Sequence, residues 1–597
     1  MQQPDVSSRT GDVTCLVMAA IFLAGFAAVA IKLKDVQLDN VASITSAGEK
    51  QMLRRIRTPG ERGRILASDG TVLASNRPVR LITLNPEHFQ SRTQDMTATN
   101  IHNAVESAAI VVGRDSPLSM HDIERHIKRN LARPLVVWRD VTDSELARFA
   151  EHEDMLPGFE CEETLVREYP EGSLASHVLG YVGRDRVDAG SGERRFNYVE
   201  FEMRGRAGLE ERYDSFLRGA PGEDAVTVDA RGFARKEWTV VPPQNGPDLI
   251  LSLDVAMQRA AEEQLRGLKG ACVALDPRNG AVLAMASSPD YNANLFVPVL
   301  TQELWQDMSN DPSKPLLNRA ISGSYAPGST FKPVTALAGM GAGFSPAAGY
   351  ECTGAYRLGK MSIRCTHLWG HDPPVLDLTM ALKESCNPFF CDLGMRAGTN
   401  ALIMAARKAG LGARTHIDLP GEAQGIVPDD EWKRANWGEK WYPGDLAQMS
   451  IGQGMLLVTP LQMARLAGGL GTGKLATPHL KAGEKGETEP LPFPEWQLEA
   501  VRKGMKRVVK DGTGRKAGTN LAVEVAGKTG TAEVGRGATR RKNAWFIAYA
   551  PAANPTVALA IVIENGETGG ATAAPKAREI LKARFGELAQ SGGKEGA

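Results

Sequence analysis

The run Pro327-Gly328-Ser329-Thr330-Phe331-Lys332-Pro333-Val334 begins with a Pro-Gly pair, which interrupts regular secondary structure. A serine hydroxyl and a lysine follow at the expected start of a helix. A proline in the first turn of a helix removes only a donor that would be unpaired anyway, so Pro333 fits there. Ser329 is therefore expected at or near the helix N-terminus, with Lys332 one turn later on the same face. The free N–H groups and the positive dipole end of such a terminus suit an oxyanion.

The lysine is expected to have an altered pKa. Because Lys332 would lie in a largely apolar helix, it would lose hydration, and its pKa would fall towards a value at which it can accept a proton. Ser329 and Lys332 thus predict a nucleophile beside its base. Ser-x-x-Lys also occurs by chance in long proteins, and an exposed capping serine is the alternative for this motif taken alone.

Length and composition narrow the class of protein. A chain of 597 residues exceeds a single-core domain, so two or three folded units are expected. Lysine plus arginine balance aspartate plus glutamate, 70 against 70, which does not suggest a general affinity for nucleic acid.

One stretch near the start is apolar enough for a membrane. Val13 to Ile31 is uncharged for 19 residues, which is enough to span a bilayer core as a helix. The stretch is long for a cleaved signal peptide, and no clear small-x-small cleavage site precedes Lys32. It therefore predicts a retained signal-anchor that follows a short cytoplasmic N-terminus at residues 1–12.

Residues 32–244 are turn-rich and read as a scaffold. Two short strands around the turn Asp69-Gly70 and helices over 101–112 and 143–152 are expected, without a nucleophile or metal pattern. The lone His177 is read as structural. The Pro- and Gly-rich run Pro242–Pro247 is the best candidate for a domain boundary.

The second half predicts an α+β domain over residues 245–588. Strands are expected at its start, over 249–253 and within 271–286, and at its end, and a largely helical region lies between them. Strands at both ends and helices between them suggest an antiparallel sheet covered by helices. The closing strands are expected over 523–526, 544–550 and 557–563, before a helix over 574–588 and a frayed tail over 589–597.

Two further motifs give Ser329 a context. Ser385-Cys386-Asn387 lies between two expected helices, and Lys528-Thr529-Gly530-Thr531 is expected to follow a strand over 523–527. Ser-x-x-Lys, Ser-x-Asn and Lys-Thr-Gly in this order are typical of the serine acyltransferases that recognise penicillin.

The remaining runs extend this likeness over nearly the whole chain. Residues 248–585 resemble the transpeptidase domain of class B penicillin-binding proteins, and most closely the elongation type, penicillin-binding protein 2. Residues 32–244 resemble the elongated non-catalytic pedestal of that family. The runs that carry the resemblance are Arg62-Gly63-Arg64-Ile65, Gly205-Arg206-Ala207-Gly208-Leu209-Glu210, Trp441-Tyr442-Pro443-Gly444-Asp445, Ser450-Ile451-Gly452-Gln453-Gly454 and Gly527-Lys528-Thr529-Gly530-Thr531.

The resemblance implies an acyl transfer to the peptidoglycan stem peptide. Ser329 would attack the carbonyl of the penultimate D-alanine and expel the terminal D-alanine. Lys332 would take the proton, Ser385 would relay protons near the leaving group, and Asn387 would orient the substrate amide and Lys332. An amine of a neighbouring stem would then resolve the acyl-enzyme, and no cofactor is required for this chemistry.

The Lys-Thr-Gly strand would bind the donor. Lys528 would supply positive potential, and Thr529 and Thr531 would hydrogen-bond the terminal carboxylate. Gly530 would leave room for the substrate backbone to approach. The N–H groups of Ser329 and Thr531 would form the oxyanion hole.

Four residues suggest a metal. Cys352, Cys365, His371 and Cys386 make a Cys3His set, which is the composition of a closed structural zinc site. The resemblance points the same way, because some elongation-type relatives carry a metal at matching positions, with aspartates in place of some of the cysteines. A Cys352–Cys365 disulfide or unpaired buried thiols are the alternatives.

The resemblance also implies location and partners. The chain would cross the inner membrane once, with its catalytic domain in the periplasm, and would work with a membrane glycan polymerase and scaffold proteins of the elongation complex; β-lactams would bind it. Charge counting favours the opposite orientation, although translocation of a large domain can override that bias. Only Arg9 precedes the span, whereas six basic residues follow it: Lys32, Lys34, Lys50, Arg54, Arg55 and Arg57.

Other functions remain open at this point. A septal transpeptidase would share the same motifs. A D,D-carboxypeptidase or a β-lactamase would share the fold and release the acyl group to water, although an anchor and pedestal argue against a β-lactamase. A non-catalytic sensor would need a cytoplasmic effector, for which the residues before Val13 leave no room.

Overall fold

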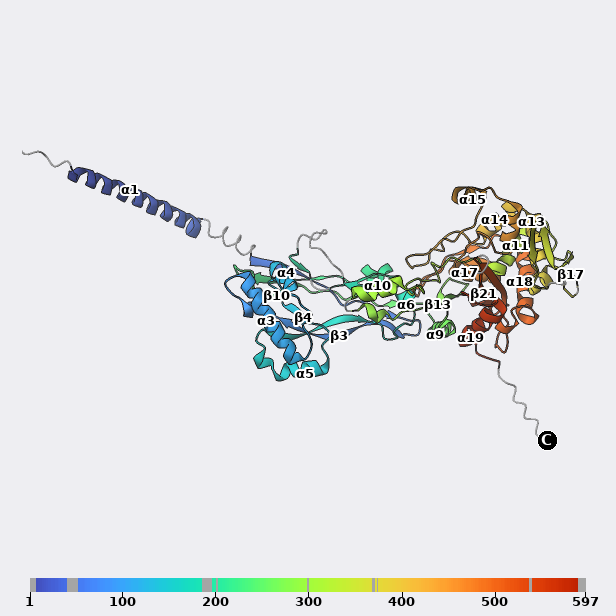
Figure 1. Ribbon diagram of the computed structural model, residues 1–597, viewed down its shortest axis with the longest axis horizontal. Coiled ribbons are helices and arrows are strands. Elements are labelled where there is room, and N and C mark those ends of the chain that lie inside the picture. The colour runs from blue at the N-terminus through green and yellow to red at the C-terminus, as the bar shows by residue number, and fades with distance from the viewer. Residues whose placement is uncertain are drawn as a thin grey trace, which may run out of the picture.

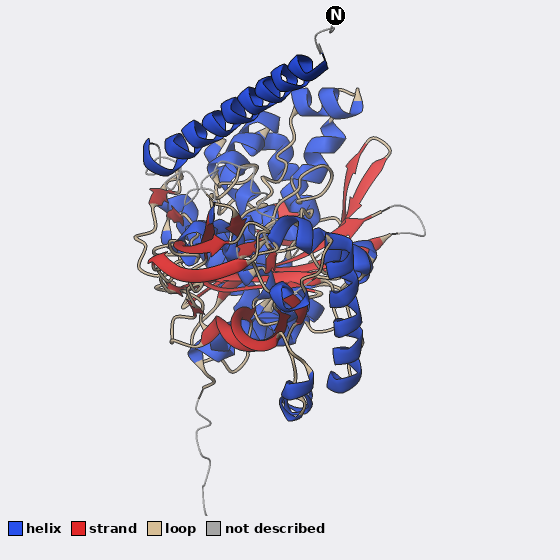
Figure 2. Cartoon of the chain, turned by 90° about the vertical axis from the view of Figure 1, so that its left-hand side faces the viewer, coloured by secondary structure: helices blue, strands red, loops and turns tan. Residues whose placement is uncertain are grey.

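The computed structural model shows a long molecule with a helix at one end, a pedestal in the middle and a larger domain at the other end (Figure 1). Seen along the long axis, most strands lie in the middle with helices around them (Figure 2). The structure describes residues 7–39, 52–184, 196–199, 202–297, 300–367, 371–372, 374–535 and 540–588. Part of the short N-terminus and of the pedestal, and the predicted tail, lie outside these ranges.

Helix α1 (Ser7–Lys34) contains the predicted span. An 18-residue window within the segment Val13–Asp39 has a mean hydropathy of 2.5, and none of that window is buried against the protein. It is the one helix of the described residues that is long and apolar enough to cross a membrane.

The pedestal is built on two sheets. One has the strand order β10-β9-β1-β7, and the other has the order β11-β2-β3-β4 with β5 also paired to β3. The long ribbon of β3 and β5 runs antiparallel from the pair Ser75–Glu168 to the pair Leu84–Phe159. The strands are β1 (Leu53–Thr58), β2 (Ile65–Leu66), β3 (Val72–Leu84), β4 (Leu135–Trp138), β5 (Phe159–Glu168), β7 (Tyr198–Val199), β9 (Gly222–Val228), β10 (Ala234–Val241) and β11 (Leu249–Ile250).

Helices cover one end of this ribbon. The expected helices over 101–112 and 143–152 correspond to α3 and α5, and the turn at Asp69-Gly70 joins β2 to β3 as expected. The apolar faces of these helices bury Ile101, Val105 and Phe149 against Trp138. The pedestal helices are α3 (Gln94–Val112), α4 (Met120–Asn130), α5 (Asp143–Glu151), α6 (Ser176–Leu179), α7 (Gly208–Arg212) and α8 (Asp214–Leu217), and a short pair of strands, β6 (Val182–Arg184) and β8 (Met203–Gly205), completes it.

A buried ionic cluster explains the motif runs of the pedestal. Arg62 Nε donates to Glu210 Oε2 at 2.6 Å, and Arg167 Nε donates to Glu210 Oε1 at 2.7 Å. Arg62 also donates to Asp214 at 2.8 Å. Because Glu210 is fully buried, removing either arginine would leave an uncompensated buried charge. The cluster therefore fixes how the segments that carry Arg62, Arg167 and Glu210 pack together.

The two domains make direct backbone and side-chain contacts across the predicted boundary. Strand β11, which lies in the region predicted to open the second domain, pairs in parallel with β2 of the pedestal. His177 of α6 is buried, and its Nε2 lies 2.7 Å from the carbonyl oxygen of Pro315 in the second domain. This contact gives His177 the structural place that was predicted.

The second domain is an antiparallel sheet of order β13-β12-β22-β21-β20, as the α+β prediction required. Its strands are β12 (Gly270–Leu275), β13 (Val282–Ser288), β20 (Ala526–Val534), β21 (Arg541–Ala550) and β22 (Val557–Ile563). Helices α9 (Val255–Leu265) and α19 (Ala574–Phe585) cover one face of this sheet. Helix α17 (Pro460–Thr472) and the helical middle cover the other face.

The helical middle lies between β13 and β20 in the sequence. Most of its helices bury their apolar faces together with α17 in one core, whereas α10 and α15 contribute no fully buried apolar residue to it. They are α10 (Gln302–Asn310), α11 (Lys332–Gly341), α12 (Leu378–Glu384), α13 (Asn387–Ala397), α14 (Thr399–Lys408), α15 (Asp430–Trp437), α16 (Pro443–Met449) and α18 (Glu495–Asp511), with small two-stranded pairs β14 (Tyr350–Glu351) with β17 (Val375–Leu376), β15 (Ala355–Leu358) with β16 (Met361–Arg364), and β18 (Lys474–Ala476) with β19 (Thr488–Pro490).

Candidate active site

Ser329 lies in a short 3-10 turn, Gly328–Phe331, directly before α11. Gly328 adopts a φ of 55°, and a Cβ there would lie 2.7 Å from the carbonyl oxygen of Thr531 in β20. Only glycine satisfies both conditions. The nucleophile turn, residues 327–331, is thereby pressed directly against β20.

Lys332 is fully buried at the start of α11. Its Nζ donates to the carbonyl oxygen of Ser385 at 2.6 Å and to Asn387 Oδ1 at 2.7 Å, and lies 3.2 Å from Ser385 Oγ. No carboxylate pairs with it among the described residues. Burial lowers the pKa of Lys332 to about 8, so the amine gives up its proton more readily than an exposed lysine does.

Ser385 lies between the two lysines of the site. It closes α12 in the left-handed conformation, with a φ of 56°, so that α13 can begin two residues later. Lys528 Nζ donates to Ser385 Oγ at 2.8 Å. Burial and the neighbouring Lys332 hold the pKa of Lys528 well below its usual range. The two amines and the hydroxyl therefore form a continuous path for a proton.

Asn387 is fixed at the first residue of α13. Its Nδ2 donates to the carbonyl oxygen of Arg364 in β16 at 2.9 Å, which leaves Oδ1 facing Lys332. The side chain is thus held from both ends. The structure brings together five residues that the sequence analysis named from three separate motifs: Ser329, Lys332, Ser385, Asn387 and Lys528. The backbone N–H of Lys332 donates to the carbonyl oxygen of Ser329. Among the described residues no hydrogen bond joins their side chains, although such bonds often form only when substrate binds.

Strand β20 carries the third motif, and its bounds correct one prediction. The residue pattern placed a strand over 523–527, before the motif, but β20 runs from Ala526 to Val534 and contains residues 528–531, as the resemblance implied. Glycine and threonine next to a lysine give a weak pattern, and pairing with β21 overrides it. Among the described strands β20 is paired on one side only, so its other edge can accept an extended peptide.

The side chains along β20 have distinct contacts. Thr529 Oγ1 lies 2.7 Å from Thr513 Oγ1, and Thr531 Oγ1 accepts from the N–H of Gly569 at 3.3 Å. A Cβ on Gly530 would lie 2.8 Å from Thr330 Cγ2. Residue 530 must therefore lack a side chain for β20 to pack against the nucleophile turn.

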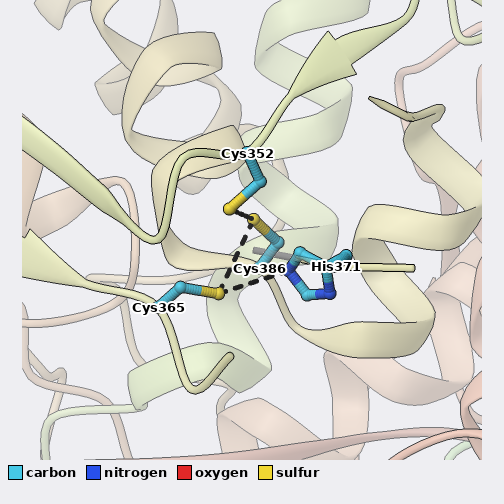
Figure 3. A group of neighbouring side chains, drawn as sticks. All are labelled: Cys352, Cys365, His371 and Cys386. Atoms are coloured by element: carbon cyan, nitrogen blue, oxygen red, sulfur yellow. Dashed lines mark hydrogen bonds between the residues drawn. The ribbon is translucent and has the colours of Figure 1, made fainter. Parts of the chain in front are cut away.

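Three cysteines and one histidine come together beside this site (Figure 3). Cys352 follows β14, Cys365 follows β16, and Cys386 immediately precedes α13. Cys386 Sγ lies 3.5 Å from Cys352 Sγ and 3.9 Å from Cys365 Sγ. Cys365 Sγ lies 3.3 Å from His371 Nε2. The four predicted residues thus present three sulfurs and one nitrogen within 4.8 Å of one another.

The thiols of this cluster are free, and one of them has a lowered pKa. In the structure each cysteine of the described residues is a free thiol, Cys352 and Cys365 among them. Hydrogen bonding with Cys386, and then with the backbone of His367 and the ring of His371, lowers the pKa of Cys365. A thiolate is the form in which cysteine binds zinc.

Sequence reasoning missed a second set of residues near the nucleophile. Tyr325, Arg319 and Glu564 converge behind the turn that carries Ser329. Tyr325 and Glu564 lie in runs that resemble the family, but nothing in the sequence indicates that they meet each other and Arg319. Gln453, whose Nε2 lies 3.3 Å from the carbonyl oxygen of Thr531, is the other such residue, although it lies within a run that the sequence analysis quoted.

Two family models match the chain. The penicillin binding protein transpeptidase domain matches residues 270–582, and the penicillin-binding protein dimerisation domain matches residues 57–251. The chain is 31% identical over 571 residues to the peptidoglycan D,D-transpeptidase MrdA of Acinetobacter baumannii, covering 90% of this chain and 82% of that protein. It is also 31% identical over 579 residues to MrdA of Escherichia coli, covering 90% and 89%.

Solved structures give the same picture. The chain is similar to the penicillin-binding protein PBP2 of Helicobacter pylori in its complex with MreC, with a TM-score of 0.75 and 29% identity over 89% of this chain and 99% of the other. It is also similar to a chain in a peptidoglycan synthase complex that coordinates polymerisation and crosslinking, with a TM-score of 0.71 and 28% identity over 98% and 99%.

The contact between the nucleophile turn and β20 predicts the cost of filling it. Gly328→Ala adds a Cβ that meets the Thr531 carbonyl, whereas Gly343→Ala adds one at a position that also has a positive φ, of 94°, and that meets nothing within 4 Å. We expect Gly343→Ala to cost about 1 kcal/mol of stability and Gly328→Ala roughly 1–3 kcal/mol more, because overpacking adds to backbone strain. The melting temperatures of the two variants measure the difference. Equal melting temperatures would contradict the close packing of the turn on β20.

Proposed function

Because the chain belongs to the penicillin-binding protein family, as a peptidoglycan D,D-transpeptidase of the elongation type, we propose that Ser329 is the residue that the stem peptide acylates. The observation that carries this proposal is the buried Lys332, held by Ser385 and Asn387 at the start of the helix that follows Ser329. A buried amine without a counter-charge is a base at neutral to mildly alkaline pH.

Acylation would proceed as an exchange of one bond for another. Ser329 Oγ attacks the carbonyl carbon of the penultimate D-alanine, and its proton passes to the neutral amine of Lys332. The N–H groups of Ser329 and Thr531 receive the developing oxyanion, a contribution on the order of 3 kcal/mol per donor. As the C–N bond breaks, a proton reaches the departing amine of D-alanine through Ser385 Oγ, which both lysines contact.

The second half of the reaction uses the same groups in reverse. The amine of a neighbouring stem peptide attacks the acyl carbon, its proton returns to the Lys332–Ser385 path, and Ser329 regains its hydrogen. One amide has replaced another, so no energy source is consumed. The unpaired edge of β20 would bind the donor backbone, with Lys528, Thr529 and Thr531 near its terminal carboxylate.

The cysteine cluster would hold one structural zinc ion. Cys352, Cys365, His371 and Cys386 supply the three sulfurs and one nitrogen of a closed tetrahedral site, and bound zinc would cross-link the segments they belong to without taking part in the reaction. Cys386 lies between Ser385 and Asn387, so such a site would brace the loop that orients Lys332.

The location and the partners of the chain are inferred from helix α1 and from the relatives. Helix α1 would cross the inner membrane with the catalytic domain in the periplasm, where peptidoglycan lies. A relative has been solved with MreC, and another within a peptidoglycan synthase complex. We therefore expect this chain to work with a scaffold protein of the MreC kind and a glycan polymerase.

Covalent labelling tests the role of Ser329. Full-length protein in detergent is incubated with a labelled penicillin beside Ser329→Ala, and intact mass is measured. A stable adduct that disappears in the variant is expected. A transient adduct with rapid loss of penicillin would instead indicate a hydrolase. The absence of an adduct in both proteins, at an unchanged melting temperature, would contradict a catalytic function.

Acylation should depend on pH through Lys332. The amine acts in its neutral form, whose share grows as pH rises through its lowered pKa of about 8. The first-order acylation constant should therefore rise from about pH 6 and level off above about pH 9. Lys332→Arg, which stays protonated, should be inactive throughout this range. A rate independent of pH in the wild-type protein would contradict Lys332 as the base.

Metal analysis tests the zinc site. Purified protein should contain one zinc ion per chain, and Cys365→Ser should lose it. A chelator should lower the melting temperature of the wild type but not that of Cys365→Ser. Cys391→Ser is the matched control, because Cys391 is equally buried but donates to the carbonyl oxygen of Ala447 outside the cluster. Zinc-free protein with an unchanged melting temperature would contradict the site.

A further inference from the structure

Tyr325, Arg319 and Glu564 meet behind the nucleophile turn and take no part in the acyl transfer described above. Tyr325 Oη donates to Glu564 Oε1 at 2.9 Å, and Arg319 Nε donates to the same oxygen at 3.0 Å. Tyr325 is largely buried, and the side chain of Arg319 is 3% exposed. One oxygen of the Glu564 carboxylate thus accepts hydrogen bonds from both a phenol and a guanidinium.

Glu564 is placed for this task by the sheet. It follows the last residue of β22, and its N–H donates to the carbonyl oxygen of Lys269 at 2.8 Å. The position of the carboxylate is therefore set by the centre of the sheet and not by a loose loop. Its side chain is 25% exposed and lines a cavity of about 600 Å³.

Tyr325 connects this carboxylate to Ser329. The backbone of Tyr325 exchanges two hydrogen bonds of 2.9 Å with Val458, and the next carbonyl, that of Ala326, accepts from Trp545 Nε1 at 3.0 Å. The N–H of Gly328 then donates to the carbonyl oxygen of Gly452 at 2.8 Å. Every residue from 325 to 328 except Pro327 is therefore held by a hydrogen bond from outside the turn, and Tyr325 is the one held through its side chain as well.

Arg319 connects the carboxylate to the junction with the pedestal. It donates to the carbonyl oxygens of Ser313 and Lys314, at 2.6 and 3.0 Å. The same loop receives α6 of the pedestal, because Asn318 Nδ2 donates to the carbonyl oxygen of His177 at 3.2 Å. Glu564 thus lies between the pedestal junction and the nucleophile turn.

We propose that Glu564 is a positioning residue for the acyl transfer: by accepting from Tyr325 and Arg319 it fixes the chain that enters the nucleophile turn, so that Ser329 lies at the distance from the bound carbonyl that attack requires. This inference rests on the proposed role of Ser329. Misplacement of a nucleophile slows the chemical step without weakening the binding that precedes it.

The test separates these two quantities in the full-length protein in detergent. Stopped-flow acylation by the chromogenic cephalosporin nitrocefin gives a first-order acylation constant and a dissociation constant. We expect Tyr325→Phe and Glu564→Ala to lower the first-order constant on the order of tenfold with the dissociation constant unchanged. Glu564→Gln keeps an oxygen that can accept from both partners, and it should restore most of the loss.

A matched tyrosine provides the control. Tyr549 of β21 is also buried, but its hydroxyl meets no hydrogen-bond partner among the described residues, so Tyr549→Phe should acylate at the wild-type rate. A wild-type acylation constant in Tyr325→Phe would overturn the proposal. So would a loss that Glu564→Gln does not restore and that tracks a lowered melting temperature, because Glu564 would then only stabilise the fold.

The acylation rates also distinguish an error in the proposed role of Ser329 from an error in the positioning role of Glu564. If Ser329→Ala were still acylated at the wild-type rate, the nucleophile would be another residue, and the positioning role would fall with it. If Ser329→Ala is inert while Tyr325→Phe and Glu564→Ala are both fully active, Ser329 keeps its role and the positioning proposal alone is wrong.

Discussion

Two lysines share one buried hydroxyl, and no carboxylate balances them among the described residues. Lys332 and Lys528 are both completely shielded from solvent, and both contact Ser385 Oγ. Because burial without a counter-charge is unfavourable for an ammonium, the site favours neutral amines and short polar contacts. The left-handed Ser385, the doubly fixed Asn387 and the close packing of β20 on the nucleophile turn all follow from the need to surround these amines with oxygen acceptors and to keep water out.

The sequence predicted the residues of this site better than it predicted their neighbours. Ser-x-x-Lys, Ser-x-Asn and Lys-Thr-Gly are local patterns, so their order alone identified Ser329, Ser385 and Lys528 as residues that would meet. The class of the fold was also predictable, since strands at both ends of a helical region allow few arrangements. The strand that carries Lys528 was misplaced because glycine and threonine have weak preferences that pairing with β21 decides.

What could not be predicted depends on contacts between distant segments. Nothing near Glu564 indicates that Tyr325 and Arg319 would find it, and nothing near Gly530 indicates that Thr330 would lie against it. The pairing of β11 with β2 is of the same kind, because two-residue strands have no periodicity to read. The cysteine cluster is an intermediate case, in which the donor types were suggestive and only the fold could bring the sulfurs within reach of one another.

The order of strands in the sheet has a consequence for how the chain folds. Strand β12 lies in the sheet between β13 and β22, and Gly270 pairs with Ile563 close to the end of the chain. During synthesis or export from the N-terminus, β12 and its hairpin partner are delivered long before β22 exists to cover their open edge. Such non-local pairing is slow, and an uncovered apolar strand recruits other chains. Strand β22 carries no group of the reaction, but by covering the edge of β12 it protects the newly made domain from aggregation.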